Sequence, residues 1–207
     1  MDTLDKEPNR PPSISRRSFI KGVIASGVTV SSVGYLFRAG EAAQVQPGLP
    51  GAVERLVTLT VNGQKRRVDI MKQETLAMTL RYKLGLTGTK LGCDRAECGN
   101  CTVLIDDVPR YSCSVLTHTV RNAKITTIEG LAGPDGKLHP VQKAFVDELA
   151  PQCGFCTPGQ IMTTVALLKV NPKPTRAQAA EALSGNLCRC GAYDYVLNAV
   201  MRAAEVS

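Results

Sequence analysis

The stretch "LGCDRAECGNCTV" (Leu91–Val103) places three cysteines, Cys93, Cys98 and Cys101, within nine positions, and Cys113 follows after eleven further residues. The C-x4-C-x2-C spacing is that of plant-type 2Fe–2S ferredoxins, whose cluster is held by four thiolates. Glycines beside the cysteines let the backbone pass close to such a cluster and aim N–H groups at sulfur. The stretch therefore predicts that these four thiolates hold a 2Fe–2S cluster.

A second quartet of cysteines has a different spacing: Cys153 and Cys156, then thirty-one residues, then Cys188 and Cys190. A helical pattern follows each pair, so each pair is expected near a helix N-terminus, whose positive end stabilises thiolates. The two quartets use all eight cysteines of the chain. The sequence thus predicts a second 2Fe–2S cluster, held by a different architecture from the first.

Two other interpretations of the cysteines stay open at this point. An even number of cysteines behind an export signal also fits a secreted, disulfide-stapled binding module. Pairs spaced C-x2-C and C-x-C also occur in zinc sites, although C-x4-C-x2-C is not a usual zinc spacing. Against the disulfides, the chain is large enough to fold without staples, and Cys188 and Cys190 are poorly spaced to pair with each other.

Length and composition are those of an ordinary globular protein. The 207 residues are 43% hydrophobic and 21% charged, which suits one or two small domains. A net charge of +7 invites a nucleic-acid hypothesis, but the basic residues are scattered, aromatic residues make up only 4%, and tryptophan is absent. The run Lys65–Arg67 is expected on a solvated strand or turn, and nucleic acid is not an expected partner.

Residues 1–43 are predicted to form a twin-arginine export signal. Arg16 and Arg17 stand ahead of a weakly hydrophobic segment rich in serine and glycine. That segment is too short for a comfortable membrane span, so no integral membrane span is expected. Cleavage is expected near "GEAAQ", residues 44–54 are expected to be a linker, and the predicted location is the periplasm.

Residues 55–130 carry the pattern of a β-grasp, ferredoxin-like domain. The segment "LVTLTVNGQKRRVDI" alternates in polarity around Asn62–Gly63, a strong hairpin signal. A helix is predicted over Thr75–Gly85, with the threonine as N-cap and the glycine as stop. Short β-branched runs after the cysteine loop predict further strands, with a turn near Asp106–Asp107 and Cys113 on the strand that follows.

Residues 131–207 are predicted to form a helical domain. Its first helix is expected in "HPVQKAFVDELA" and its last in "YDYVLNAVMRAA". Between them, "TPGQIMTTVALLKV" offers Thr157 as an N-cap followed by proline, and "TRAQAAEALSG" carries a capping box of Thr175 with Gln178. The predicted fold class is α+β: a β-grasp domain followed by a small four-helix-bundle 2Fe–2S domain.

Taken together, these motifs resemble the small iron–sulfur subunit of the molybdenum hydroxylases, the family of xanthine dehydrogenase and aldehyde oxidoreductase. The similar segments are "GTKLGCDRAECGNCTV", "TTIEGL", "HPVQKAF", "QCGFCTPGQIM" and "SGNLCRCGAY". With the twin-arginine leader, the chain is most similar to periplasmic aldehyde oxidoreductase iron–sulfur subunits.

The resemblance implies roles for individual residues. The cysteines of the helical domain would hold the cluster nearer the molybdenum, and those of the β-grasp domain the cluster nearer the flavin. We call the first set the proximal quartet: Cys153, Cys156, Cys188 and Cys190. We call the second set the distal quartet: Cys93, Cys98, Cys101 and Cys113. Gln152 and Cys190 occupy positions that would contact the pterin across a subunit interface.

The resemblance also implies partners, and an electron-transfer role with no catalytic residue in this chain. A large catalytic subunit would bind molybdopterin as its cytosine dinucleotide, and a flavin subunit would bind FAD, with a cytochrome as the other acceptor considered. Electrons would pass singly through the proximal and then the distal cluster. Aldehydes are the implied substrates; a carbon monoxide dehydrogenase or N-heterocycle hydroxylase is the alternative enzyme.

The two histidines of the chain, His118 and His139, have no convincing catalytic partner in the sequence. His139 stands before Pro140 at an expected helix start, so a structural role is predicted for it.

Overall fold

The hairpin signal at Asn62–Gly63 forms the first two strands of a five-stranded sheet in the computed structural model, which describes residues 55–206. Strand β1 (Leu56–Val61) pairs antiparallel with β2 (Gln64–Asp69), and both turn residues have positive φ, 51° and 75°. That backbone twist is the one that joins two strands through a two-residue loop. The predicted export signal and linker lie outside the described residues.

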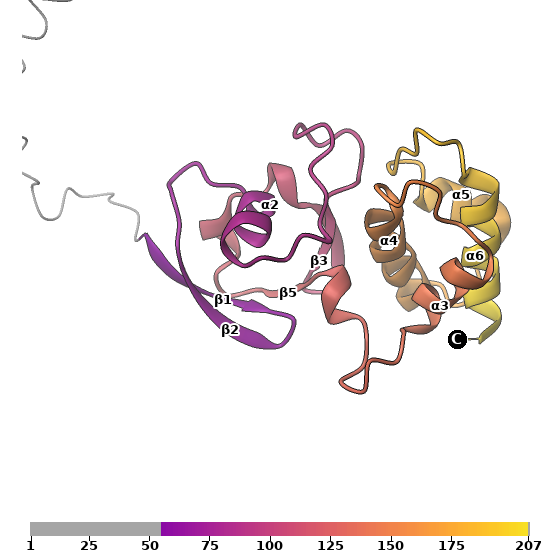
Figure 1. The fold of residues 1–207 in the computed structure, drawn as a ribbon, viewed down its shortest axis with the longest axis horizontal. Helices are drawn as coiled ribbons and strands as arrows, with labels where there is room; N and C mark the ends of the chain where they lie inside the picture. Colours follow the sequence, from indigo (N-terminus) through magenta and orange to yellow (C-terminus); the bar gives the residue numbers. More distant parts are fainter. Residues whose placement is uncertain (1–54, 207) are drawn as a thin grey trace, which may run out of the picture. The chain divides into compact units, whose positions relative to one another are not determined.

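The sheet has the order β2-β1-β5-β3-β4, with β1 and β5 (Lys124–Thr126) parallel and the other pairs antiparallel (Figure 1). Strands β3 (Thr102–Ile105) and β4 (Val108–Tyr111) are joined by the predicted turn at Asp106–Asp107, again at positive φ. The mixed sheet with a helix against it confirms the β-grasp prediction.

The predicted helix after β2 begins where expected but changes its winding. Thr75 caps α2 (Leu76–Met78) by accepting a hydrogen bond from the Met78 N–H, and the chain continues as the π-helical segment η1 (Thr79–Lys83). Three short 3-10 turns complete this half: η2 (Ser112–Ser114), η3 (Thr117–Val120) and η4 (Ile128–Gly130). Cys113 lies in η2, which directly follows β4. Its predicted place on the strand is wrong by two residues, because the strand ends at Tyr111.

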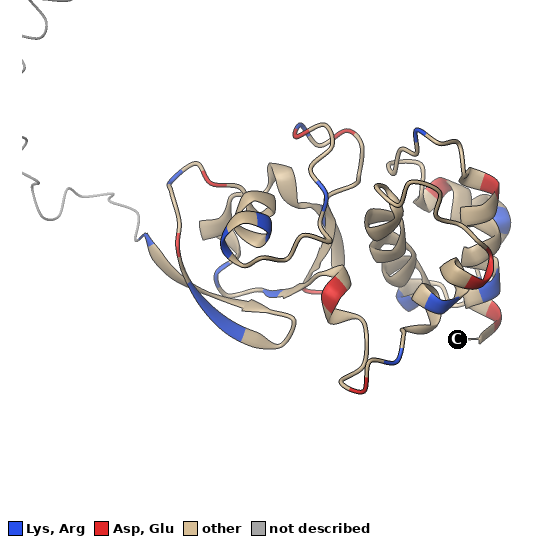
Figure 2. Ribbon diagram, viewed as in Figure 1, with Lys and Arg blue, Asp and Glu red and all other residues tan. Residues whose placement is uncertain are grey.

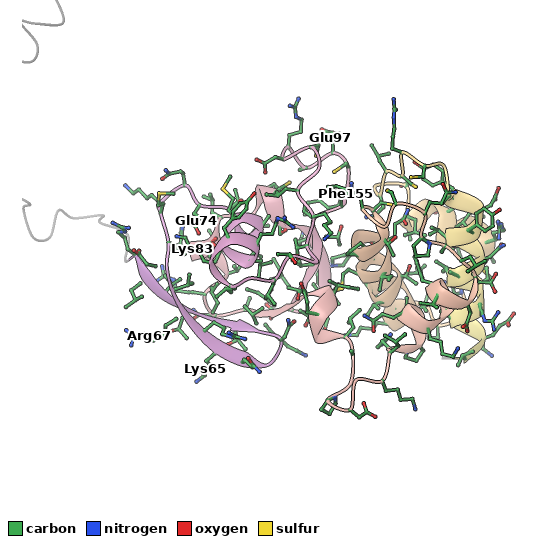
Figure 3. All side chains as sticks on the ribbon, in the orientation of Figure 1. Lys65, Arg67, Glu74, Lys83, Glu97 and Phe155 are labelled. Atoms are coloured by element: carbon green, nitrogen blue, oxygen red, sulfur yellow. The ribbon has the colours of Figure 1, made fainter. Side chains whose placement is uncertain are left out.

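A buried carboxylate anchors this segment to the rest of the sheet domain. Glu74 is paired with Lys83 at 2.6 Å and accepts further hydrogen bonds from the Thr79 hydroxyl and the Met71 N–H (Figure 3). Burial alone would raise the pKa of Glu74, but these donors outweigh it and hold the pKa below its ordinary 4.5. The Thr79 hydroxyl also contacts that of Thr117 at 2.8 Å, which links η1 to η3.

Four helices follow the sheet, as predicted: α3 (Pro140–Asp147), α4 (Thr157–Val170), α5 (Arg176–Ala182) and α6 (Tyr193–Val206). The capping box of Thr175 with Gln178 is confirmed at α5. The prediction of Thr157 as a cap is wrong. The N-cap of α4 is Cys156, because its carbonyl accepts the first intrahelical hydrogen bond, from the Gln160 N–H at 3.1 Å.

Each half has its own apolar core, and one strand residue joins the two. The sheet core lies between the β-strands and α2, with residues such as Leu59 and Leu80 fully buried. The helical core gathers Phe145, Met162 and Val200, and it includes Leu104 from β3, because α4 packs against that strand. The β-grasp and helical halves therefore share a packed boundary within residues 55–206.

The surface carries both signs of charge, with one basic strand (Figure 2). Lys65, Arg66 and Arg67 are exposed on β2, at the edge of the sheet, which confirms the expected solvated strand. Lysine and arginine on an edge strand discourage pairing with another chain. Among the described residues, none of the helices is long and apolar enough to cross a membrane.

Candidate metal centres

The distal quartet is built by a loop that winds around its own cysteines. Between Cys93 and Cys101 the backbone takes left-handed φ values at Asp94 (52°), Ala96 (60°) and Gly99 (68°). Repeated left-handed residues turn successive N–H groups to one side, which is the geometry of an anion-binding nest. The backbone N–H groups of the loop therefore point toward the distal cysteine sulfurs, which would carry negative charge as thiolates.

Three of these N–H groups donate to sulfur. The Glu97 and Cys98 N–H groups donate to Cys93 Sγ at 3.3 and 3.4 Å, and the Ala96 N–H donates to Cys113 Sγ at 3.3 Å. The last bond ties the loop to η2, so all four distal cysteines belong to one hydrogen-bonded structure. Hydrogen bonds to sulfur are among the means by which proteins set iron–sulfur reduction potentials.

Cys93 and Cys101 differ in burial, and their pKa values diverge. Burial raises the pKa of Cys101 to about 12, with Cys113 as its neighbour. At Cys93 burial also opposes ionisation, but the backbone donors of residues 95, 97 and 98 outweigh it and lower the pKa to about 7. A coordinating metal ion deprotonates a thiol outright, so Cys101 would ionise on binding iron, whereas Cys93 ionises more readily without it.

The proximal quartet is built from two loops at the starts of two helices. Cys156 is the N-cap of α4, and Cys188 precedes α6; both are buried and pack with Ala192. The Cys188 N–H donates to the Tyr193 hydroxyl at 2.9 Å, which fixes that loop on the first residue of α6. Cys153 and Cys190 are exposed.

In the proximal quartet burial alone does not decide the pKa: at buried Cys188 burial opposes ionisation, but N–H donors of residues 190–192 outweigh it and lower the pKa. Burial raises the pKa of Cys156 to about 12, with Cys188 beside it. The N–H of Phe155 and contact with Cys190 lower the pKa of Cys153. Each quartet thus contains a thiol whose pKa is lowered, such as Cys93 or Cys153, and a buried thiol whose pKa is raised, Cys101 or Cys156.

The thiols interact in pairs: Cys93 with Cys98, Cys101 with Cys113, Cys153 with Cys190, and Cys156 with Cys188. All eight are free cysteines. Within residues 55–206, no three Cys, His, Asp or Glu side chains converge as they do around a single metal ion. A four-thiolate 2Fe–2S cluster has two irons with two thiolates on each, so two pairs per quartet fit that group.

A cavity of about 440 Å³ lies between the quartets. Its wall contains thiols from both sets: Cys93 and Cys98 from the distal side, and Cys153, Cys156 and Cys188 from the proximal side. Asn100, Phe155 and Tyr193 complete much of the lining. Figure 3 marks Glu97 on the distal loop and Phe155 on the proximal loop, which stand at the same end of the sheet and the bundle.

Hydrogen bonds hold the two cysteine loops together. The Leu187 N–H donates to the Cys98 carbonyl at 2.9 Å, so a residue adjacent to Cys188 is bonded directly to a distal cysteine. The buried Asn186 amide donates to the Gly99 carbonyl at 2.9 Å, and its oxygen accepts from the Thr163 hydroxyl at 2.9 Å. These bonds fix the separation of the quartets.

Close backbone approach reinforces this contact. A Cβ placed on Gly99 would lie 2.3 Å from the Gly185 carbonyl oxygen, and one on Gly159 would lie 2.4 Å from the Gly99 carbonyl oxygen. The roles of Asn186, Gly159 and Gly185 were not predicted from the sequence. Their only signal was their place beside cysteines in "CTPGQ" and "SGNLCRC", because their partners lie far away in the chain.

The remaining predicted residues fall in different places. Gln152 is exposed beside Cys153, at the outer edge of the proximal quartet. His139 caps α3: its Nδ1 accepts the Val141 N–H at 3.2 Å, which confirms the structural role predicted for it. His118 lies half-buried in η3, in the sheet half.

Two family models match the chain in succession. The 2Fe-2S iron-sulfur cluster binding domain matches residues 59–124, and the [2Fe-2S] binding domain matches residues 127–201. The first match contains the distal quartet and the second contains the proximal quartet. The two matches support an iron–sulfur cluster in each half.

Known proteins extend the likeness along the chain. A nicotinate dehydrogenase subunit of Pseudomonas putida is 47% identical over 74% of this chain and 97% of its own length. The aldehyde oxidoreductase iron-sulfur-binding subunit of Escherichia coli is 39% identical over 93% of this chain and 89% of its own length.

Solved structures agree in fold. Quinoline 2-oxidoreductase from Pseudomonas putida matches with a TM-score of 0.70 and 40% identity over 74% of this chain and 96% of the matched chain. The aldehyde oxidoreductase from Desulfovibrio desulfuricans also matches with a TM-score of 0.70 and 40% identity, over 74% of this chain and 17% of the longer one. The chain therefore belongs to the 2Fe–2S subunits of the molybdenum hydroxylase family, the electron-transfer subunits of oxidoreductase complexes.

Proposed function

We propose that the distal and proximal quartets each hold one 2Fe–2S cluster, and that the chain relays electrons for an aldehyde-oxidising enzyme. The observation that carries the proposal is the pairing of eight free thiols into two sets, with backbone N–H groups donating to Cys93 and Cys113. When bound, the clusters would supply acceptance and release of single electrons.

The chain's own residues would do three things for this function. The left-handed loop donates hydrogen bonds to distal sulfur and favours the charged form of the site. The helix starts at α4 and α6 place positive dipole ends near the proximal thiols. Asn186 and the Leu187 N–H hold the two sites at a fixed separation. Transfer between two sites in one rigid unit then needs no domain motion.

The proximal end has the surface expected for a partner protein. Cys153 and Cys190 are exposed, and apolar side chains around them are exposed as well: Phe155, Leu187, Tyr193 and Tyr195. Phe155, Leu187 and Tyr193 line one cavity with the proximal thiols, and exposed aromatic and aliphatic residues grouped in this way are typical of interfaces. The partner proposed is a large subunit that bears molybdopterin as its cytosine dinucleotide, with Gln152 and Cys190 at the pterin, and a subunit with FAD, or a cytochrome, is the proposed acceptor.

The extent of similarity supports aldehydes as substrates and export as the destination. The alignment with the Escherichia coli aldehyde oxidoreductase subunit covers 93% of this chain, so it reaches into the first fifty residues, whereas that with the nicotinate dehydrogenase subunit covers 74%. We therefore propose a twin-arginine leader and a periplasmic location together with the aldehyde oxidoreductase function. An N-heterocycle hydroxylase is the second candidate, favoured by the higher identity of 47% to the nicotinate dehydrogenase subunit.

Metal analysis of the full chain, isolated without oxygen, tests the cluster proposal. We expect about four irons and four acid-labile sulfides per chain, and two distinct EPR signals after dithionite reduction. Colourless protein with zinc in place of iron, or with the thiols oxidised to disulfides, would overturn it. The complex isolated from the native host, assayed with aldehydes and with nicotinate, decides between the two substrate classes.

Export has a separate test. Replacing Arg16 and Arg17 together by lysine should keep the protein in the cytoplasm, while the unchanged chain appears in the periplasmic fraction. Equal periplasmic amounts of both would contradict the twin-arginine proposal.

A further inference from the structure

Gln160 is a buried polar side chain that the fold does not explain. It lies in the first turn of α4, with 1% of its surface exposed. Its side-chain nitrogen Nε2 is buried and makes no hydrogen bond within residues 55–206. A buried amide nitrogen without an acceptor is unfavourable, and native proteins keep few of them.

The other end of the same amide contacts a proximal cysteine. Gln160 Oε1 lies 3.5 Å from Cys156 Sγ, where the thiol donates and the amide oxygen accepts. The contact follows from helix geometry, because a side chain at position i points back toward position i−4, and the Gln160 N–H is already bonded to the Cys156 carbonyl. The amide is thus held at the sulfur of Cys156.

Ligation changes what this contact requires. A thiolate has no hydrogen to donate, so two acceptors, sulfur and Oε1, would face each other at 3.5 Å. Turning the amide by half a revolution exchanges Oε1 and Nε2, which have nearly the same size. The turned amide places N–H at the thiolate and gives the unpartnered nitrogen its acceptor.

We infer that Gln160 donates a hydrogen bond from Nε2 to Cys156 Sγ in the cluster-bound protein and thereby raises the reduction potential of the proximal cluster. The inference rests on the proposed function, because it needs a cluster at the proximal quartet. Reduction adds negative charge to the cluster and its sulfurs, and a donor to sulfur stabilises the reduced form more than the oxidised form.

The alternative is that Gln160 only fills space in the core. A space-filling glutamine would be replaceable by an apolar side chain of similar length with no change in the cluster. The two roles therefore predict different reduction potentials for the same variant.

The test is an EPR-monitored redox titration of the full chain and of Gln160→Met, which keeps the length of the side chain and removes the amide. The proximal signal is the one lost in Cys156→Ser. We expect the redox equilibrium of the proximal cluster to move about tenfold toward the oxidised form, equivalent to ~59 mV for one electron, with the distal cluster unchanged. The control is Gln142→Met, whose amide serves the cap of α3 and which should move neither potential.

A second measurement does not depend on how the variant folds. Protein labelled with ¹⁵N at the glutamine side-chain amide should show a nitrogen hyperfine coupling to the reduced proximal cluster, in the wild-type chain and in Gln152→Ala alike. Absence of that coupling in the reduced wild-type chain, or equal potentials in the wild type and Gln160→Met, would overturn the inference. Iron-free wild-type protein would instead overturn the proposed function, so the two failures are distinct.

Discussion

The two quartets reach the same number of thiols by opposite routes. Three distal cysteines lie within one loop of nine positions, and their outer pair, Cys93 and Cys98, is half-buried by the chain itself. The proximal cysteines come from two loops separated by two helices, α4 and α5, and their outer pair, Cys153 and Cys190, is exposed. The distal site is therefore organised by its own backbone, whereas the proximal site depends on the packing of helices and offers its outer face to a partner.

The largest effect should come from breaking one quartet while leaving the other. In Cys156→Ser the proximal site loses a buried ligand, so we expect iron to fall from about four to about two per chain and one EPR signal to vanish. The distal loop keeps its own hydrogen bonds and should retain its signal. Loss of both signals would show that the distal site is not independently organised.

The next largest effect should come from a substitution in the contact between the quartets, measured as a loss of stability. Gly99→Ala combines a left-handed φ of 68° with a Cβ only 2.3 Å from the Gly185 carbonyl oxygen, so we expect a loss of about 3 kcal/mol in the free energy of unfolding. Gly63→Ala is the matched control, because its φ of 75° is similar but its Cβ would meet no atom within 4 Å. It should cost about 1 kcal/mol. Equal thermal shifts for the two variants would contradict the close approach.

Asn186→Ala tests the same contact between the quartets, because it removes hydrogen bonds without adding a steric clash. Two buried bonds are lost, to the Gly99 carbonyl and the Thr163 hydroxyl, so stability should fall by about 2 kcal/mol. The magnetic interaction between the two reduced clusters should change as well, because their separation is no longer fixed. Asn198→Ala, whose side chain bonds Arg176 on the surface, should change neither quantity.

Acid should weaken the sheet half through Glu74. The folded-state pKa of Glu74 lies below its ordinary 4.5, so its contribution is present above that pH and is lost as pH falls through the folded-state pKa. Glu74→Gln should cost about 1.5 kcal/mol at pH 7, and its difference from wild type should shrink below pH 4.5. Asp69→Asn, which breaks an exposed pair with Arg55, should cost about 0.5 kcal/mol at most. A constant Glu74→Gln difference from pH 7 to pH 3 would contradict the mechanism.

The stability of the helical half should also depend on pH, through His139. The change should occur at higher pH than the change caused by Glu74 and should be smaller. Burial and the charge of Lys169 lower the pKa of His139 below 6.5, so the folded state favours the neutral imidazole, whose Nδ1 accepts the Val141 N–H at the start of α3. The cap is fully effective above pH 6.5 and weakens as pH falls through 6.5 toward the folded-state pKa. His139→Asn keeps a capping acceptor and should remove this dependence, worth about 0.5 kcal/mol. Hydrogen exchange of α3, corrected for intrinsic rates, measures it.

Features that neighbouring residues decide could be predicted from the sequence, whereas features that depend on distant residues could not. The hairpins at Asn62–Gly63 and Asp106–Asp107 and the caps at Thr75 and Thr175 were predictable, because neighbouring residues decide them. Cys spacing located both quartets for the same reason. Neither the role of Asn186 nor the tight fit at Gly159 was predictable, because each depends on residue 99 or its neighbour, sixty or more positions away. The unpaired amide of Gln160 likewise appears only once α4 is packed.

Leu104 adds a consequence for building chimeras from members of this family. Leu104 belongs to strand β3, yet its side chain is part of the helical core. The distal and proximal cysteine loops are also joined, by the hydrogen bond from the Leu187 N–H to the Cys98 carbonyl. A hybrid that joined one homologue's sheet to another's helices would have to preserve both contacts across the splice. A chimera should therefore take residues 55–206 from a single homologue, with the crossover points placed outside this range.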